Sequence, residues 1–345
     1  MSNNIRVAVL GTGQMGSGMM KLILEKQGME LVGACDTRND GFETRTFTGA
    51  AGGVAVGIYN NLDAMLKEAR PDIALQATCS TVSEAEKDIH TIIKNGINVI
   101  SIAEEMSFPA AESPELGEKI NKAALANNVT VLGTGINPGF VLDLLAIALS
   151  GVCYKVDCII ATRINDLSPY GPTVLNSQGV GITPEKFAEG IADGSIVGHY
   201  GFPQSIGMIA KALGWKIDRI EEHREPIVSE VERESEFVKI LPGMTAGCNH
   251  TATAYMDGKP VIKLIHPQQV HPHMGDVTTG DYIEIKGSPD IKLSGSPEIP
   301  GGVGTQALAV NMIPRVLNAA PGLKSMIDLP IPAAIMGDAR TIGII

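Results

Sequence analysis

Residues 5–16 read IRVAVLGTGQMG, and this stretch decides the fold of the first half of the chain. The apolar run Ile5–Leu10 is typical of a strand that is buried on both faces of a parallel sheet. A glycine-rich turn follows it directly, and residues 19–24 then have helical spacing. Glycines at this spacing permit a tight turn, a close backbone approach to a pyrophosphate and close packing of the helix on the strand. These glycines are Gly11, Gly13 and Gly16.

A carboxylate stands where a dinucleotide-binding domain needs one. The second expected strand, Leu31–Cys35, ends at Asp36. A carboxylate at this place binds the adenosine ribose hydroxyls of NAD and repels the 2′-phosphate of NADP. Arg38 could instead hold that phosphate, so use of both cofactors stays open and NAD is favoured. The residues expected to bind NAD or NADP here are Gly11, Thr12, Gly13, Gln14, Met15, Gly16, Asp36 and Arg38.

The alternation of strand and helix continues to about residue 135. Repeated units of this length predict an α/β domain of the Rossmann type, with a doubly wound parallel sheet. The expected helices are 62–69, 82–95 and 114–127, and the expected strands are 72–78, 97–102 and 129–132. Ligands of such sheets bind beyond the carboxyl ends of the strands. The residues expected to contact the cofactor there are Thr78, Cys79, Ser80 and Asn137.

Glu104 and Glu105 follow the expected strand 97–102. Two adjacent carboxylates at a buried strand end are costly unless they are solvated, paired or used in chemistry. Alternating strand geometry sends them in different directions, so we expect one of the two to face the cleft. A raised pKa would suit that residue to general base catalysis. The sequence does not tell which of the two it is, and a solvated loop acid is the competing interpretation.

After Gly139 the pattern changes to strands that alternate apolar and polar residues. This predicts a second, α+β domain built on an open, mainly antiparallel sheet. The expected strands are 156–164, 217–222, 235–241, 251–256, 261–265 and 282–287, and the expected helices are 140–149, 184–193 and 204–213. A last helix, 304–318 with a break at Pro314, is expected to pack back on the first domain. The domains are therefore expected at 1–139, 140–302 and 303–345.

Several polar residues of the second half are candidates for contact with a ligand. A fixed guanidinium is the usual partner of a substrate carboxylate, so Arg163 is one candidate, with a structural ion pair as the alternative. A loop histidine, His199, is another. The full set of expected substrate contacts is Asn137, Arg163, Asp166, Gln178 and His199, and Asn311 is expected at the cofactor. The histidines of residues 266–273 alternate with prolines, so a surface or subunit-contact loop is favoured there and no metal is expected.

Composition and termini limit the partners. The 38 acidic and 27 basic side chains give a net charge of −11, which disfavours nucleic-acid binding. No signal peptide and no membrane span are expected, and the five scattered cysteines are typical of a reducing cytoplasm. We therefore expect a cytoplasmic protein with a small-molecule substrate, and a homodimer joined through the second domain.

Four motifs together resemble one family over nearly the whole chain. The first half resembles the NAD(P)-binding domain of dihydrodipicolinate reductases. The family that combines all the motifs is 2,4-diaminopentanoate dehydrogenase, which is related to amine dehydrogenases. The motifs are SIAEEMSFP at 101–109, GTGINPGFVLD at 133–143, GHYGFP at 198–203 and VNMIPR at 310–315.

This resemblance implies an NAD(P)-dependent oxidative deamination at C4 of 2,4-diaminopentanoate, a step of ornithine degradation that releases 2-amino-4-oxopentanoate and ammonia. It also implies that a glutamate of the AEE segment, Glu104 or Glu105, is the acid/base. The chain lacks the His-His pair of dihydrodipicolinate reductases and the lysine that homoserine dehydrogenases have near Glu104. The alternatives are an amine dehydrogenase that works reductively on small ketones or aldehydes, a dihydrodipicolinate reductase-like enzyme and a non-catalytic NAD(H) sensor.

Overall fold

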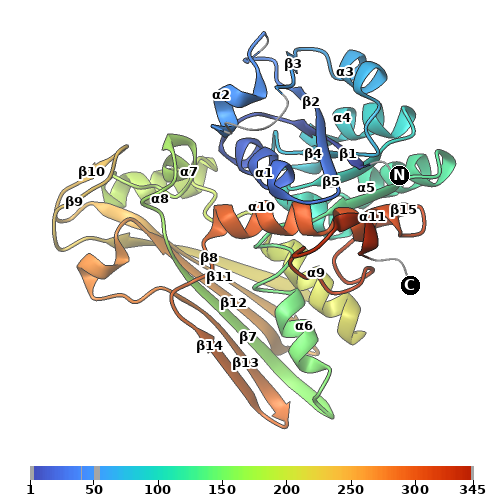
Figure 1. Cartoon of the computed structure of the whole chain (residues 1–345). Coiled ribbons are helices and arrows are strands. Elements are labelled where there is room, and N and C mark those ends of the chain that lie inside the picture. Colours follow the sequence, from blue (N-terminus) through green and yellow to red (C-terminus); the bar gives the residue numbers. More distant parts are fainter. Residues whose placement is uncertain (1–3, 40, 50–54, 343–345) are drawn as a thin grey trace. The chain divides into compact units, whose positions relative to one another are not determined.

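The structure, a computed structural model, describes residues 4–39, 41–49 and 55–342. The chain divides into two compact units (Figure 1). The first unit joins the chain up to Phe140 with the chain from Gly301 onward, and the second unit spans Val141–Pro300. The boundaries expected from the sequence, after residues 139 and 302, lie within two residues of these limits.

The first unit contains the parallel sheet that the sequence predicts. Within the described residues seven strands pair in the order β15-β6-β5-β4-β1-β2-β3, and every pair is parallel. The strands are β1 (Ile5–Leu10), β2 (Met29–Cys35), β3 (Ile58–Tyr59), β4 (Ile73–Gln76), β5 (Asn98–Ser101), β6 (Thr130–Gly133) and β15 (Gly322–Lys324). The two edge strands, β3 and β15, were not expected, because two or three residues show no periodicity.

Helices connect these strands and pack their apolar sides on the sheet. They are α1 (Gln14–Glu25), α2 (Thr44–Thr48), α3 (Leu62–Ala69), α4 (Val82–Lys94), α5 (Pro114–Ala126), α10 (Gly301–Asn311) and α11 (Ile313–Leu317), with the 3-10 helices η1 (Glu104–Ser107), η2 (Pro109–Ala111) and η4 (Ala339–Thr341). In α4 the buried residues recur at helical spacing and include Ile89, Ile92 and Ile93. The last part of the chain returns to the first unit, where α10 lies beside α1 and the Nε2 of Gln306 donates to the Gln14 carbonyl at 3.3 Å (Figure 1).

The second unit contains an open, mainly antiparallel sheet, as expected. In the described chain its six strands pair in the order β14-β13-β7-β12-β11-β8, and β7–β12 is the parallel pair among them. These strands are β7 (Lys155–Asp166), β8 (Arg219–Val228), β11 (Thr245–Met256), β12 (Lys259–Gln269), β13 (Gly280–Ser288) and β14 (Ile291–Gly295). The prediction of a single strand over 235–241 is wrong. The chain turns back there between β9 (Arg233–Glu234) and β10 (Lys239–Ile240), and Ser235 N–H donates to the Val238 carbonyl at 2.9 Å.

The six-stranded sheet has two different faces. Along β7 the residues Ile159, Ala161 and Arg163 are buried, whereas Ile160 and Thr162 between them are partly exposed. We call the side of Arg163 the buried face and the side of Ile160 the open face. The helices of this unit are α6 (Leu144–Ser150), α7 (Pro172–Ser177), α8 (Pro184–Asp193) and α9 (Phe202–Leu213), with the 3-10 helix η3 (Pro272–Gly275). Helix α6 starts four residues later than expected, because the Asp143 carboxylate caps it by accepting from Leu144 N–H at 2.6 Å.

A search of the described residues for a helix long and apolar enough to span a bilayer found none.

Candidate functional site

The glycine-rich turn between β1 and α1 has the shape of a phosphate cradle. Gly11 has a φ of +92°, and a Cβ on Gly16 would lie 1.8 Å from the Gly11 carbonyl oxygen, so both positions need glycine. A Cβ on Gly13, in contrast, would meet no atom of the described chain within 4 Å. Gly13 is also the N-cap of α1, and none of the described side chains caps that helix. The open space and the unpaired N–H groups of the first helical turn fit a pyrophosphate.

Asp36, which follows β2, links the end of that strand to the glycine-rich turn after β1 through hydrogen bonds. Its Oδ2 accepts from the N–H and the hydroxyl of Thr12, both at 2.8 Å, and its Oδ1 accepts from Arg38 N–H at 2.9 Å. Burial acts to raise the pKa of this carboxyl, but the hydrogen bonds from Arg38 and Thr12 outweigh it, and the pKa lies below its ordinary value. The carboxylate is therefore charged at neutral pH. The side chain of Arg38 is exposed.

The turn after β4 positions the two glutamates. Thr78 Oγ1 accepts from Gln76 Nε2 at 2.6 Å, and burial raises the pKa of the Cys79 thiol, which is therefore uncharged. Ser80 accepts from Glu105 N–H at 3.1 Å through its carbonyl, and its side chain hydrogen-bonds the Glu104 carboxylate. The segment expected to contact the cofactor thus also supports the acidic segment.

The structure gives Glu104 and Glu105 different surroundings, although both lie in η1. Glu105 Oε2 accepts from Val82 N–H at 2.8 Å, so this carboxylate caps the first turn of α4. The Glu104 carboxyl accepts from its own backbone N–H and from Ser80, but loss of solvent around it outweighs these bonds and raises its pKa to about 7, with a smaller contribution from the neighbouring charge of Glu105. A carboxyl with this pKa can accept and return a proton at neutral pH. The expected strand alternation is wrong here, because β5 ends at Ser101 and the 3-10 helix η1 begins at Glu104.

Asn137 and Asn311 lie in different parts of the first unit. Asn137 follows β6 in the loop beside Ile136, whose N–H donates to Thr305 Oγ1 at 3.0 Å. Asn311 ends α10, and its amide oxygen accepts from Ile335 N–H at 3.1 Å. Asn311 therefore has a partner in the C-terminal tail, and its contact with the cofactor stays a prediction.

Arg163 does not have the free guanidinium expected of a substrate anchor. It is 2% exposed, and its Nη1 lies 2.7 Å from Oδ1 of Asp281 in a buried ion pair. Its Nη2 donates to the Ile299 carbonyl at 2.5 Å, while Asp281 Oδ2 accepts from Ile299 N–H at 2.9 Å. The Arg163–Asp281 ion pair thus binds both the carbonyl and the N–H of Ile299. The alternative of a structural ion pair, left open by the sequence, is the one that this geometry supports.

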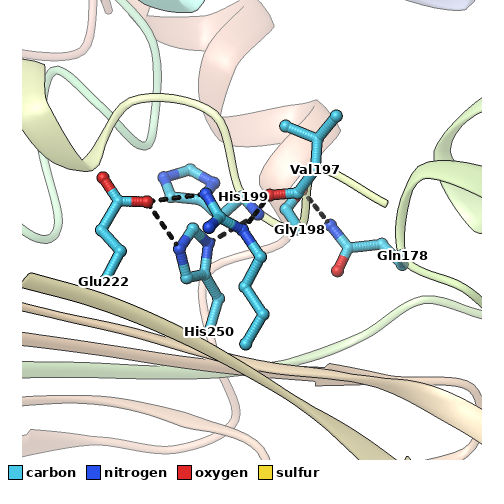
Figure 2. A network of polar contacts seen from close by, with 7 residues as sticks. Gln178, Val197, Gly198, His199, Glu222 and His250 are labelled. Carbon is cyan, nitrogen blue, oxygen red and sulfur yellow. Dashed lines mark hydrogen bonds and ion pairs between the residues drawn. The ribbon is translucent and has the colours of Figure 1, made fainter. Parts of the chain in front are cut away.

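His199 is held by a network that comes from several elements (Figure 2). The N–H of His199 donates to Nδ1 of His250 at 3.0 Å, and Nε2 of His250 lies 3.0 Å from Glu222 Oε2. Arg224 donates to the same Glu222 oxygen and, through Nε, to the Val197 carbonyl, both at 2.6 Å. These contacts fix the backbone of residues 197–199 above β8 and β11.

The three histidines of this region are neutral. Burial lowers the pKa of His199 well below its ordinary value, and the pKa of His266 falls to about 3 for the same reason. Because Nδ1 of His250 accepts a hydrogen bond from an N–H, its proton must lie on Nε2, which donates to Glu222. The Nδ1 of His266 donates to the Arg163 carbonyl at 2.7 Å, so its Nε2 carries a lone pair. The ring centres of His199 and His266 are 4.8 Å apart.

Asp166 and Gln178 support turns of the second unit. Asp166 Oδ1 accepts from the N–H and the hydroxyl of Ser168 at 2.8 and 2.5 Å and from His271 N–H at 3.1 Å. Gln178 Nε2 donates to the Gly198 carbonyl at 2.7 Å, as Figure 2 shows, and so adds a further tie on residues 197–199. Its amide oxygen is buried without a hydrogen-bond partner in the described residues.

The prediction that residues 266–273 form one loop is wrong. β12 continues to Gln269, and His266 is 3% exposed on the buried face of the sheet. No group of three histidine, cysteine or acidic side chains that could hold a metal occurs in the described parts of the chain. The supporting residues Glu222 and Arg224 were not singled out from the sequence. Their spacing of two residues within 219–228 predicts that they lie on one face of a strand. It does not predict that this strand lies beside His250.

Comparison with known proteins gives a consistent result. A family model described as the 2,4-diaminopentanoate dehydrogenase C-terminal domain matches residues 140–343, and one described as the N-terminus of dihydrodipicolinate reductase matches residues 5–102. The 2,4-diaminopentanoate dehydrogenase of Acetoanaerobium sticklandii is 45% identical over 97% of this chain and 96% of that protein. An amine dehydrogenase of Streptomyces virginiae is 24% identical over 80% of this chain and 82% of that protein. The solved structure of an amine dehydrogenase from Mycobacterium smegmatis shares the fold, with a TM-score of 0.85 at 24% identity over 96% of this chain and 97% of that one.

Proposed function

Because the chain belongs to the 2,4-diaminopentanoate dehydrogenase family, we propose that it oxidatively deaminates 2,4-diaminopentanoate at C4 with NAD or NADP. The products are 2-amino-4-oxopentanoate, ammonia and the reduced cofactor. The observation that carries this proposal, beside the family match, is the carboxyl of Glu104, whose pKa of about 7 suits proton transfer at neutral pH.

Glu104 is proposed to take a proton from the C4 ammonium of the substrate, because only the neutral amine has the electron pair that expels a hydride from C4. When bound, the nicotinamide cofactor accepts this hydride. The residues that would hold the cofactor are those of the glycine-rich turn and Asp36, which fit it by their open space, helix N-terminus and charge.

The second half of the reaction uses the same carboxyl. Glu104 first releases to solvent the proton that it took from the ammonium. Water then attacks the substrate iminium at C4, and the Glu104 carboxylate accepts the proton that this water loses. The carboxylic acid then returns a proton to the leaving nitrogen, and ammonia departs as the C4 ketone forms. Ser80, hydrogen-bonded to Glu104, and Glu105, fixed on α4, keep the acid/base in place.

The experiment compares two amines with the purified protein. Formation of NADH and NADPH is followed at 340 nm with 2,4-diaminopentanoate and with a plain secondary amine such as 2-aminobutane. A kcat/KM at least tenfold higher for the diamino acid supports the proposal. Equal or higher activity with the plain amine, or with small ketones and ammonia in the reverse direction, would favour the amine dehydrogenase alternative. The similarity to the Streptomyces virginiae amine dehydrogenase supports that alternative.

NAD is proposed as the preferred cofactor, because the charged Asp36 carboxylate repels the 2′-phosphate of NADP. Asp36→Asn keeps an oxygen that can accept from Thr12 but removes the negative charge. We expect the ratio of kcat/KM for NAD to that for NADP to fall by roughly tenfold or more, with the exposed Arg38 then free to hold the phosphate. Thr37→Ala is a neighbouring control. An unchanged ratio in Asp36→Asn would show that this carboxylate does not select the cofactor.

A homodimer is proposed to form through the open face of the second unit. Ile160 and Thr162 are partly exposed there in the middle of the sheet, and Lys263 and Glu284 flank Ile160 on the two neighbouring strands. A second copy related by a twofold axis can bury the apolar centre and pair the opposite charges. We expect twice the chain mass by light scattering at micromolar concentration, and the single-chain mass for Ile160→Glu. A wild-type protein of single-chain mass would contradict the proposal.

A reducing, cytoplasmic setting is proposed from the thiols. None of the five cysteines, which all lie in the described parts of the chain, forms a disulfide, and the contacts described above require none of them to be oxidised.

A further inference from the structure

Two polar side chains are fully buried at the ends of neighbouring strands in the parallel sheet of the first unit. Gln76 ends β4 and Ser101 ends β5, and the two residues are partners in the strand register. Both are 0% exposed, and the Ser101 hydroxyl donates to the Gln76 amide oxygen. The other buried residues of these two strands are apolar. Because an apolar pair of the same shape can replace a buried hydrogen-bonded pair without loss of stability, the fold alone does not call for these polar groups.

This pair binds the two segments that follow the strands. Nε2 of Gln76 donates to Thr78 Oγ1 at 2.6 Å and to Cys79 Sγ at 3.1 Å, both in the turn after β4. Oγ of Ser101 accepts from Ala103 N–H at 3.2 Å, in the segment after β5. One amide and one hydroxyl therefore connect the turn after β4 with the backbone that leads into η1.

The next partner across the sheet also shapes the place of η1. It is Gly133 of β6, where a Cβ would lie 1.7 Å from the Met106 carbonyl oxygen. The backbone of η1 thus passes over the sheet where β6 has no side chain. The turn after β4 contacts η1 as well, because the Ser80 carbonyl accepts from Glu105 N–H at 3.1 Å. Glu104, the first residue of η1, is therefore placed by three neighbouring strand ends.

We propose that Gln76 and Ser101 are positioning residues for Glu104, which keep the turn after β4 at the distance where Ser80 bonds to the Glu104 carboxylate. They act through the contacts described above and not on the reacting atoms. The inference rests on the proposed function in one respect, that Glu104 is the acid/base. The bond from Ser80 lowers the pKa of Glu104 against the effect of burial. Loss of the Gln76–Ser101 bond should loosen the turn, weaken the bond from Ser80 and raise the pKa of Glu104.

The test follows the titration of Glu104 with and without substrate. Infrared difference spectroscopy measures the protonated carboxyl over the pH range around 7, and Glu104→Gln identifies its band. The kcat/KM for 2,4-diaminopentanoate is measured over the same range. Ser101→Ala removes the shared hydroxyl, and Gln76→Leu replaces the amide by an apolar side chain. Circular dichroism measures the thermal unfolding of each variant, and either variant decides the question should the other fail to fold.

We expect both variants to move the titration of Glu104 upward by roughly half to one pH unit and to lower kcat/KM at neutral pH about three- to tenfold, the effect of one hydrogen bond. Ser80→Ala should move the titration in the same direction. Added to Ser80→Ala, the Ser101→Ala change should have little further effect on the titration, because both act through the same bond to Glu104.

Thr130→Val is the matched control. Thr130 is 1% exposed at the start of β6, and its hydroxyl donates to the Ala320 carbonyl at 3.2 Å. This variant also loses a buried hydrogen bond but should keep the wild-type titration and kinetics. If Ser101→Ala and Gln76→Leu lower the unfolding temperature and leave the titration of Glu104 unchanged, or move it downward, the inference is overturned, because the pair then serves the fold alone.

The infrared titration needs no substrate, so the two proposals can fail separately. A wild-type protein that does not turn over 2,4-diaminopentanoate but shows the upward shift in both variants would contradict the proposed function and support the positioning of Glu104. An active wild-type protein whose variants show no shift would contradict the positioning alone.

Discussion

Glu104→Gln is expected to lower kcat for oxidative deamination by roughly 10²–10⁴-fold while the protein still binds NADH. The amide has nearly the shape of the carboxylate and can keep the hydrogen bond to Ser80, but it cannot accept a proton from the substrate ammonium or from the attacking water. Both half-reactions therefore lose their base. Stopped-flow measurement of the first turnover, with NADH binding by fluorescence, separates the loss of chemistry from a loss of cofactor.

The matched control for this variant is Glu105→Gln. Glu105 caps α4 through the 2.8 Å bond to Val82 N–H, and an amide oxygen can still accept from that N–H. We expect a change of less than about tenfold in kcat and a small loss of stability, of the order of 1 kcal/mol. If Glu105→Gln loses turnover and Glu104→Gln keeps it, Glu105 is the base. If both variants keep normal turnover, neither glutamate is the base.

The pH dependence gives a second check on Glu104. Its pKa of about 7 means that the carboxylate, the form that accepts a proton, becomes populated as the pH rises through 7. The kcat/KM for deamination should therefore rise with pH in this range and level off above it, whereas reductive amination, which needs the carboxylic acid, should fall. Glu104→Gln should lack this step. A profile that stays flat between pH 6 and 8 in the wild type would contradict the assignment.

Asp281→Leu is expected to destabilise the second unit by about 3–5 kcal/mol, because it leaves the buried guanidinium of Arg163 without its counter-charge. It also removes the acceptor of Ile299 N–H. The double variant Arg163→Met/Asp281→Leu removes both charges and should recover most of this loss, since two apolar side chains of similar size tolerate burial. Urea denaturation followed by circular dichroism measures both.

The same variants decide whether Arg163 holds the substrate. If the ion pair is structural, the double variant keeps a KM for 2,4-diaminopentanoate within a few-fold of wild type. If Arg163 instead binds the substrate carboxylate, the double variant loses substrate binding although it is stable, and the interpretation of Arg163 given above is wrong.

The sequence predicts most of the architecture because the local signals agree. Helix α3 over 62–69 and helix α8 over 184–193 were predicted to the residue, since Asn61 and Thr183 cap them and αL residues follow them. The glycine-rich turn and Asp36 lie where the spacing put them. The strands β3 and β15 were missed, because two- and three-residue strands at a sheet edge are defined by pairing with a neighbour and not by their own pattern.

The site was harder to predict, because its contacts join residues far apart in the chain. Alternation along β7 places Arg163 on the buried face, but its partner Asp281 lies 118 residues later. The choice between Glu104 and Glu105 depends on a 3-10 helix that begins at Glu104 itself, and periodicity does not reveal it. The bond from the Ile335 N–H in the tail to the Asn311 amide oxygen could not be predicted, because a backbone N–H has no sequence signature.

The measurement that tests the central claim most directly is the stoichiometry of one reaction. Purified protein is incubated with NAD and 2,4-diaminopentanoate, and NADH, ammonia and the amino ketone are quantified, with ornithine and lysine as controls. Equal amounts of NADH, ammonia and 2-amino-4-oxopentanoate, and none from the two controls, are the predicted result. NADH without ammonia, or no NADH from 2,4-diaminopentanoate under conditions where a plain amine or ketone is turned over, would contradict the account.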